Sequence, residues 1–423
     1  MNTVKDTIKE QEKSEKLKEV RLRYLDLVRE LPFPNRNDED WKNTNLKNYL
    51  NIETALTQRY NFLHGTFSSL KGPAGMAVQG PAGRCCIYSM EDAAESGFLN
   101  KLISLKAIEK SVRYSPDALV RALFERGVYI KVLKDKNCGE NREQRYGSKN
   151  TKKENMININ FDKFKKTSGK GYAFYWVVVD IEGGADVILT DSTQNEVNIF
   201  GEIDIIAGNG STVKYVSIDD TSSGGFHRKK ALISAGEKSR ISTYTAVTGT
   251  GDFRGELELI IQGPGVRAEL KKAYTGEGMA RKDFVTLQHH ASGEAFSSLS
   301  VLGVLGDSSS GSFTGTIAVD RNAKGTDAYQ VSRTLLLSGA SRARAVPRLE
   351  ILADDVKCSH GASLGRIDKD DMFYLMSRGV SEKDAEIMAA EGFFGRFIDA
   401  LPDSDSARFV EERLSTSLKR ICR

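Results

Sequence analysis

The spacing of hydrophobic and polar residues changes along the chain. Residues 14–31 carry apolar side chains at helical intervals with charged residues between them, which predicts an amphipathic helix. Pro32 ends this helix because proline cannot continue it. Residues 52–64 and 103–126 are also predicted to be largely helical, and we expect the second helix to run through Gly127 into a strand.

Beyond this point the pattern changes to short runs with strand character that recur roughly every ten residues. FYWVVVDI, ADVILTD and GELELIIQG are examples, and Gly, Asn, Asp and Ser separate them. In GELELIIQG, Leu257 and Leu259 alternate with Glu256 and Glu258. No long helical pattern interrupts the strands, so they predict one large all-β unit. Its length favours a β-solenoid, but the spacing leaves a pair of β-sandwiches open.

Two other segments complete the predicted organisation. Residues 135–155 are polar and charged, which predicts a solvent-exposed, mobile loop within the β unit. Helical spacing returns near the C-terminus, with one helix ending before Gly379, a second starting at Ser381 and a last one from about Asp405 to Ile421. We therefore expect an N-terminal helical region at 1–126, a β core at 127–366 and a C-terminal helical region at 367–423.

Composition and motifs exclude several classes of protein. The chain has 61 basic and 57 acidic residues, and this near balance argues against a dedicated nucleic-acid binder. It has no apolar run long enough for a transmembrane helix, and its first 30 residues match neither a secretory signal nor a transit peptide. The expected location is therefore the cytoplasm. No Walker-type motif occurs, so we expect that this chain is not itself a P-loop ATPase and binds no nucleotide.

Metal-ligand residues are sparse. Five cysteines without a C-x-x-C pair predict neither a disulfide framework nor a self-contained zinc or iron–sulfur centre. They are Cys85, Cys86, Cys138, Cys358 and Cys422.

Cys358 and His360 stand two positions apart in LEILADDVKCSHGASLG, residues 349–365. On a strand such residues project from the same face, so a thiolate and an imidazole there could bind one metal ion. The alternative is a small buried cysteine and a hydrogen-bonded histidine at the end of the β core. The adjacent His289 and His290 would point to opposite faces of a strand and could not chelate together.

Four blocks of sequence carry a resemblance to a known family. They are DEDWKNTNL, ALFERGVYIKV, the segment from Gly311 to Asp368 that contains CSHGA, and MFYLMSRGVSEKDAEIMAAEGFF. Together they resemble the SufB/SufD family, scaffold proteins of the SUF system of iron–sulfur cluster assembly. SufB-type chains tend to be longer, with a glutamate-rich sequence in place of CSHGA and a functional cysteine upstream. Length, DEDWK and CSHGA therefore place the chain with the SufD branch, although residues 150–300 match only loosely.

The resemblance implies a fold and partners. It implies a right-handed parallel β-helix between N-terminal and C-terminal helical regions, which decides for the solenoid. It also implies a heterodimer with a SufB-type paralogue and a SufC-type ABC ATPase bound through the C-terminal helices. The chain would then be a non-catalytic scaffold subunit that supports iron acquisition. The cluster would be transient and shared with the partner subunit, and the nucleotide would bind to the ATPase.

The same resemblance suggests roles for individual residues. His360, together with Cys358, is expected to face the SufB-type partner and to supply a ligand or help iron to enter. Phe394, Phe397 and Ile398 form an apolar stripe that could dock the ATPase, or could pack on the chain's own β-helix. Two other functions remain as alternatives: a self-sufficient homodimeric scaffold, and a β-helix enzyme acting on carbohydrate, which is usually secreted.

Overall fold

The structure is a computed structural model, and part of the chain is described in it. The loop expected at 135–155 and most of the helix expected at 52–64 lie outside the described residues. The described residues are 2–12, 14–56, 76–79, 85–99, 110–124, 126–134, 156–164, 171–195, 197–221 and 225–422.

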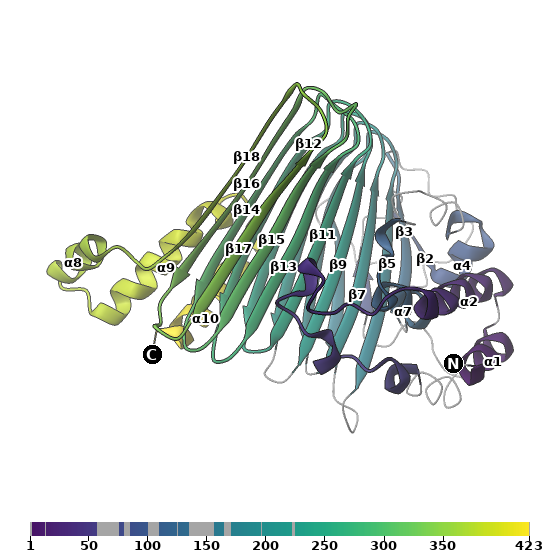
Figure 1. Ribbon diagram of the computed structural model, residues 1–423, viewed down its shortest axis with the longest axis horizontal. Coiled ribbons are helices and arrows are strands. Elements are labelled where there is room, and N and C mark those ends of the chain that lie inside the picture. The colour runs from purple at the N-terminus through teal and green to yellow at the C-terminus, as the bar shows by residue number, and fades with distance from the viewer. Residues whose placement is uncertain are drawn as a thin grey trace.

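The described strands form two nine-stranded sheets, and from β3 onward the chain alternates between them (Figure 1). The first sheet contains β1 (Met76–Gln79), β4 (Met156–Phe164), β6 (Asp186–Asn195), β8 (Thr212–Thr221), β10 (Arg240–Gly249), β12 (Arg267–Gly276), β14 (Phe296–Leu305), β16 (Thr326–Leu336) and β18 (Val356–Gly365). The second contains β2 (Cys85–Ser89), β3 (Arg126–Val132), β5 (Tyr172–Ile181), β7 (Asn198–Ala207), β9 (Phe226–Ala235), β11 (Asp252–Ile261), β13 (Arg281–His290), β15 (Ser310–Val319) and β17 (Arg342–Ile351).

Strand pairing identifies the solenoid. From β3 onward each strand pairs in parallel with the strand two places further along the chain, as β10 does with β12 and β11 with β13. Among the described strands, antiparallel pairing is confined to β1 with β4 and β2 with β3. The chain therefore crosses from one sheet to the other at each step and winds a flattened parallel β-helix. This confirms the solenoid and excludes the pair of sandwiches.

Helices lie at both ends of the sequence. The N-terminal part contains α1 (Asn2–Gln11), α2 (Glu15–Glu30), α4 (Met90–Glu95), α7 (Ser115–Leu123) and the short 3₁₀ turns η1 (Glu39–Trp41) and η2 (Leu46–Asn48). The C-terminal part contains α8 (Lys369–Ser377), α9 (Glu382–Ile398) and α10 (Ser404–Ile421). None of these described helices combines the length and apolar character that crossing a membrane requires.

The helix expected to run through Gly127 ends earlier than predicted. It ends at Leu123, and Gly127 lies inside β3. A side chain at residue 127 would overlap the ring of Phe124 and the side chain of Met90, so glycine allows β3 to pass close to these two residues.

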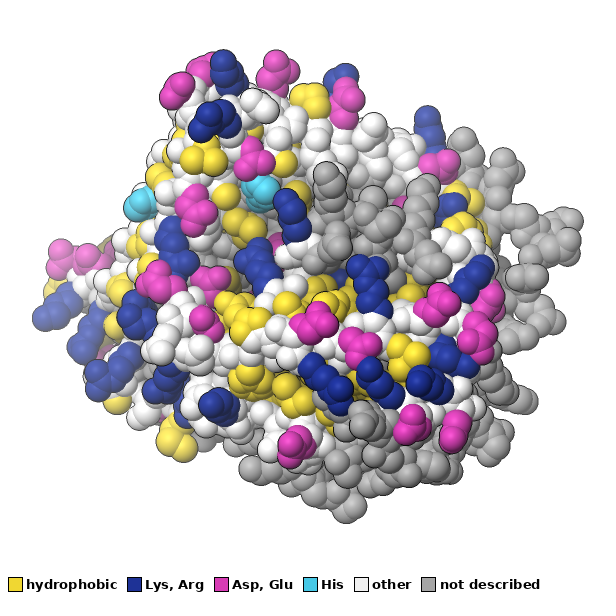
Figure 2. Space-filling view, turned by 45° about the vertical axis from the view of Figure 1, so that its right-hand side comes forward, with side chains coloured by type: hydrophobic (Ala, Val, Ile, Leu, Met, Phe, Trp, Pro, Cys, Tyr) yellow, Lys and Arg dark blue, Asp and Glu magenta, His cyan; other side chains and the backbone are white. Residues whose placement is uncertain are grey.

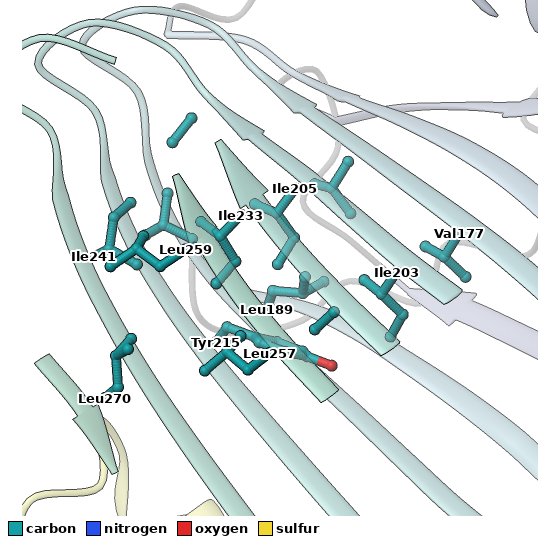
Figure 3. Packing of buried hydrophobic residues seen from close by; sticks show 14 of the residues in the cluster. Val177, Leu189, Ile203, Ile205, Tyr215, Ile233, Ile241, Leu257, Leu259 and Leu270 are labelled. Carbon is teal, nitrogen blue, oxygen red and sulfur yellow. The ribbon is translucent and has the colours of Figure 1, made fainter. Parts of the chain in front are cut away.

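Apolar side chains fill much of the space between the two sheets, which we call the lumen. Every second residue of a strand points into it, and parallel register stacks these residues in ladders, such as Val177 on Ile203 (Figure 3). Leu257 and Leu259 belong to this core, as their alternation predicted. Burial of this apolar surface is the main stabilising term of the β-helix.

Further apolar clusters attach the helices to the outer faces of the sheets. The N-terminal helices pack on the second sheet, where Trp176 and Phe200 point outward. Helices α9 and α10 pack on the first sheet, against outward residues such as Val216 and Val304. Figure 1 shows the N-terminal helices at the β2 end of the β-helix and α8 and α9 towards the β17 and β18 end.

Candidate functional site at the open end of the β-helix

The last two strands leave both sheets open at the same end of the molecule. β17 pairs with β15 and β18 pairs with β16, and within the described chain no strand lies beyond either of them. We call this surface the open end. Leu349, Ile351 and Leu364 are exposed on it, whereas the preceding strands are mostly buried. The open end thus presents two strand edges together with apolar side chains.

Cys358 and His360 lie on β18, on the face that turns towards the lumen. Their register partners on β16 are Ala328 and Gln330, and both partners are buried. Cys358 is half-buried and packs against a small apolar cluster that includes Ile317 and Ala328. His360 is exposed, because the described chain adds no further turn above it. The structure therefore places the two residues on one face, at the open end.

The surroundings of Cys358 favour the protonated thiol. Burial, and then the nearby Asp327 carboxylate, raise the pKa of the Cys358 thiol, while a backbone hydrogen bond from Ala328 opposes the shift. A metal ion that binds this thiol must therefore displace a proton. Among the described residues, no group of three or more His, Cys, Asp or Glu side chains is arranged to hold a metal ion. Cys358 and His360 thus offer two ligands, where an iron–sulfur cluster takes four.

The other described histidines are engaged elsewhere. His289 and His290 point to opposite faces of β13, as predicted: His289 pairs with Asp320 on the outer face at 3.0 Å, and His290 contacts Ser297 in the lumen at 2.8 Å. Burial lowers the pKa of His290 to about 4, so this imidazole stays neutral. His227 is also buried in the lumen, where burial lowers its pKa to about 4.

The open end lies within a segment that matches a family model. The model is described as "SUF system FeS cluster assembly, SufBD core domain", and it matches residues 164–393, more than half of the 423-residue chain. The chain belongs to the SufBD family. The matched segment includes the strands from β5 to β18, and with them Cys358 and His360.

Curated relatives of this SufBD chain are iron–sulfur cluster assembly proteins. It is 30% identical to the SufD protein of Bacillus subtilis over 235 residues, which are 54% of each chain. It is 38% identical to the SufD protein of Escherichia coli over 115 residues, 27% of each chain. A SufBD family protein of Synechocystis is 28% identical over 232 residues, 53% of this chain and 50% of the relative. The chain spans about half the length, or less, of these relatives.

The expected docking residues on the C-terminal helices of this SufBD chain have little exposed surface. Phe394 and Phe397 on α9 are buried against the outer face of the first sheet, and Ile398 is partly buried in the same cluster. The stripe therefore packs on the chain's own β-helix, the alternative that its apolar spacing had left open. Instead, α8 has no buried residue, and Phe373 and Tyr374 on it are 74% and 58% exposed.

The cysteines differ from expectation at one position. Cys85, Cys358 and Cys422 are free thiols, as a chain without a disulfide framework should have. Cys86, however, is disulfide-bonded. Cys138 lies outside the described residues.

Buried charges on the outer face of the second sheet were not foreseen. Arg121 of α7 donates to Glu202 at 2.7 Å and to Asp204 at 3.4 Å, and all three side chains are buried. Arg228 likewise binds Glu256 at 2.8 Å and Asp117 of α7. These pairs join the N-terminal helices to the β-helix. In the sequence these charged residues alternate with apolar ones along the strands. Such alternation is typical of a solvent-exposed face, so it did not indicate that the charges would be buried.

A groove of about 860 Å³ lies between the N-terminal segment and the outer face of the second sheet. Its charged residues are largely paired, for example Arg348 with Glu39 and Asp40 at 3.0 and 2.9 Å. Figure 2 shows one face of the molecule, on which apolar patches are bordered by both basic and acidic side chains. The groove is formed by residues far apart in sequence, so sequence spacing could not reveal it.

Proposed function

We propose that the chain is a SufD-type, non-catalytic scaffold subunit of the SUF machinery. Membership of the SufBD family and the similarity to SufD proteins support this assignment. In this role the chain does not transform a substrate. It holds one side of a site at which iron and sulfur are assembled into a nascent cluster, which is its cargo.

The observation that supports this role most directly is the position of Cys358 and His360, a thiol and an imidazole of the kinds that can bind metal, on an open strand edge. Both sheets end at the open end, where Leu349 and Leu364 expose apolar surface. A second β-helix docking there would pair with the edges of β17 and β18 and cover this surface. Further thiolate or carboxylate ligands from that subunit would complete the coordination that Cys358 and His360 begin. The proposed partner is a SufB-type paralogue.

The exposed side of α8 is the proposed contact for the SufC-type ATPase. Phe373 and Tyr374 are large aromatic residues, the kind of side chain that anchors a helix in a partner's groove. This proposal keeps the expected location of the contact, the C-terminal helices, but transfers it from Phe394, Phe397 and Ile398 to α8.

Anaerobic affinity purification of the tagged chain from its host, followed by mass spectrometry, tests the assembly. Recovery of an ABC-type ATPase and a longer, cysteine-bearing paralogue supports the SufD-type role. Recovery of the chain alone as a dimer supports the homodimeric scaffold instead.

His360→Ala tests the site itself. Iron and acid-labile sulfide in the purified assembly should fall, because one of the two ligands on this subunit is removed. His289→Ala is the matched control, since this partly exposed histidine lies on the outer face of β13 and pairs with Asp320. Equal iron and sulfide contents in His360→Ala and wild-type assemblies would refute the ligand role.

A further inference from the structure

Exposed charges on the last turn of the β-helix are sorted by sign between the two rims of the open end. The basic rim lies where β17 begins and β18 ends, and it carries Arg342, Arg344 and Arg366. The Arg366 guanidinium lies 3.8 Å from the position that a Cβ atom would take at Gly339, which places it beside the turn that leads into β17. The acidic rim lies at the opposite edge, where β17 ends and β18 begins, and it carries Glu350, Asp354 and Asp355.

These charges have no partner within the described chain. All six side chains are exposed, and none of them forms an ion pair with another described residue. Lys357 adds one positive charge beside the acidic rim and Asp368 one negative charge beside the basic rim, so an excess of like charge remains at each. A surface of this kind, beside two open strand edges, suits a partner whose charges have the complementary order.

Two identical open ends can meet about a two-fold axis in two ways. β17 and β18 run in opposite directions, because the chain reverses in the turn at 352–355, so both ways pair antiparallel edges. In the like-strand arrangement β17 meets β17 and β18 meets β18, and the basic rim of each copy lies against the acidic rim of the other. In the crossed arrangement β17 meets β18, and each rim lies against the rim of its own sign. The charges therefore favour the like-strand arrangement.

The backbone edges favour the same arrangement. Arg342 and Leu352 donate their backbone N–H groups to carbonyl oxygens on the β15 side, so the residues at alternate positions of β17 turn their backbone groups to the open edge. Pro347 occupies one of these alternate positions and has no N–H to donate, whereas β18 contains no proline. The like-strand arrangement confines the missing donor to the β17 seam and leaves the β18 seam complete. The crossed arrangement would put Pro347 in both seams.

The like-strand arrangement also brings the proposed ligands together. Cys358 and His360 lie on the lumen face of β18, and a two-fold axis through the seam keeps this face of both copies on the same side. In the register centred on Ser359, Cys358 of one copy lies opposite His360 of the other, with their Cβ atoms about 5 Å apart. Cys358 and His360 of the same strand are about 7 Å apart. The same register sets Arg366 of one copy beside the turn that holds Asp354 in the other.

We propose that, in the absence of the SufB-type paralogue, the open end docks on a second copy of the chain in the like-strand arrangement, and that two Cys358 thiolates and two His360 imidazoles form a four-ligand metal site at the β18 seam. This inference rests on the ligand role that the proposed function gives to Cys358 and His360. One copy supplies two ligands, so the site is incomplete without the second. Two thiolates and two imidazoles are a ligand set that holds a tetrahedral divalent ion such as Zn²⁺. Each Cys358 thiol gives up its proton to solvent as the metal binds.

Sedimentation of the isolated, purified chain tests the docking, and the wild-type chain should be a dimer. Arg342→Glu/Arg344→Glu makes both rims acidic, and Asp354→Lys/Asp355→Lys makes both rims basic. Each pair of substitutions should raise the dissociation constant of the dimer at least about 100-fold, because like charges then meet at both rims. A chain with all four substitutions has its two rims exchanged in sign, so it complements itself again and should dimerise like the wild type. Recovery of the dimer in this chain also shows that the substitutions do not act by unfolding it.

Co²⁺ tests the shared site in the same samples, purified without oxygen. The wild-type dimer should bind one Co²⁺ ion for every two chains, with the visible absorption of a tetrahedral thiolate site. Both single-rim variants should lose this absorption, and the chain with all four substitutions should regain it. Cys358→Ser should abolish the thiolate absorption but leave the dimer intact.

A monomeric wild-type chain, single-rim variants that stay dimeric, or a four-substitution chain that stays monomeric would each overturn the docking. A dimer that binds one Co²⁺ ion per chain, or none, would overturn the shared site. The proposed function is tested separately, by recovery of the paralogue in the affinity purification. A chain that recovers the paralogue but does not dimerise therefore keeps its SufD-type role and loses only this inference.

Discussion

Two phenylalanines of the C-terminal helices should respond in opposite ways to truncation. Phe394 on α9 has no exposed surface and packs in the cluster that attaches α9 and α10 to the β-helix. Phe394→Ala should lower the free energy of unfolding by about 3–5 kcal/mol, the range for a buried phenylalanine. Phe373 on α8 is 74% exposed, so Phe373→Ala should change stability by no more than about 0.5 kcal/mol.

Binding to the SufC-type ATPase should show the reverse order. If Phe373 is an anchor of that contact, its truncation should cost about 2 kcal/mol of binding, an increase in Kd of about 30-fold. Phe394→Ala should bind the ATPase nearly as well as the wild type at a temperature at which it remains folded. Urea unfolding of the isolated chain gives the stabilities, and calorimetric titration with the ATPase gives Kd.

The reasoning fails if the two residues exchange roles. A Phe394→Ala chain of wild-type stability that no longer binds the ATPase would show that the stripe on α9 is a docking surface after all. An unchanged Kd in Phe373→Ala would remove α8 from the proposed contact. Met279, an exposed residue on the turn after β12, provides a matched control because its truncation also removes a large exposed side chain.

The lumen and the open end offer three more tests. Burial lowers the pKa of Lys272 to about 8, below the 10.5 of an unfolded lysine. Between these two pKa values the unfolded chain binds more protons than the folded chain, so the free energy of unfolding should rise as pH increases from about 8 to 10.5. Lys272→Met should abolish this pH dependence and stabilise the protein by up to about 3 kcal/mol at pH 7, measured by urea unfolding. A less stable Lys272→Met protein would show that the buried lysine does not destabilise the fold. Asp327→Asn should lower the pKa of the Cys358 thiol and so speed its alkylation by iodoacetamide at fixed pH. An unchanged alkylation rate would show that the Asp327 carboxylate has no influence on this pKa. Leu349→Arg should leave the stability of the isolated chain within about 0.5 kcal/mol but prevent recovery of the SufB-type paralogue, whereas normal recovery would place the contact elsewhere.

Local alternation was sufficient to assign faces along the strands, but not to say what covers them. Leu257 and Leu259 point into the lumen, as their pattern predicted. Glu256 and Glu258 point outward, but they too are largely buried, because Arg228 and Lys230 on the adjacent strand pair with them beneath the N-terminal segment. The Arg228–Glu256 ion pair, for example, joins residues 28 positions apart. It depends on strand register, which the sequence does not specify without a repeated motif.

At the candidate site, too, local spacing predicted which face each side chain occupies but not what covers it. Cys358 and His360 share one face of β18, as their two-residue spacing on a pleated strand predicted. Their different exposure depends on β18 being the last strand, which became clear only from the order of strands in the sheet. The apolar stripe of α9 correctly indicated a buried helix face, but a hydrophobic period cannot distinguish the chain's own β-helix from a partner, so the sequence left both surfaces open for Phe394 and Phe397.

The architecture gives a physical reason for locating the two proposed metal ligands on β18. A parallel β-helix has an edge at each end of both sheets, and an exposed edge bearing apolar side chains promotes association. In this chain Leu349 and Leu364 lie on those edges beside Cys358 and His360. A subunit that covers the edges would exclude water from the thiol and the imidazole, and would add its own ligands in the same step. Cluster formation would then depend on assembly, because neither the low-dielectric surroundings nor the full ligand set exists before the open end is covered.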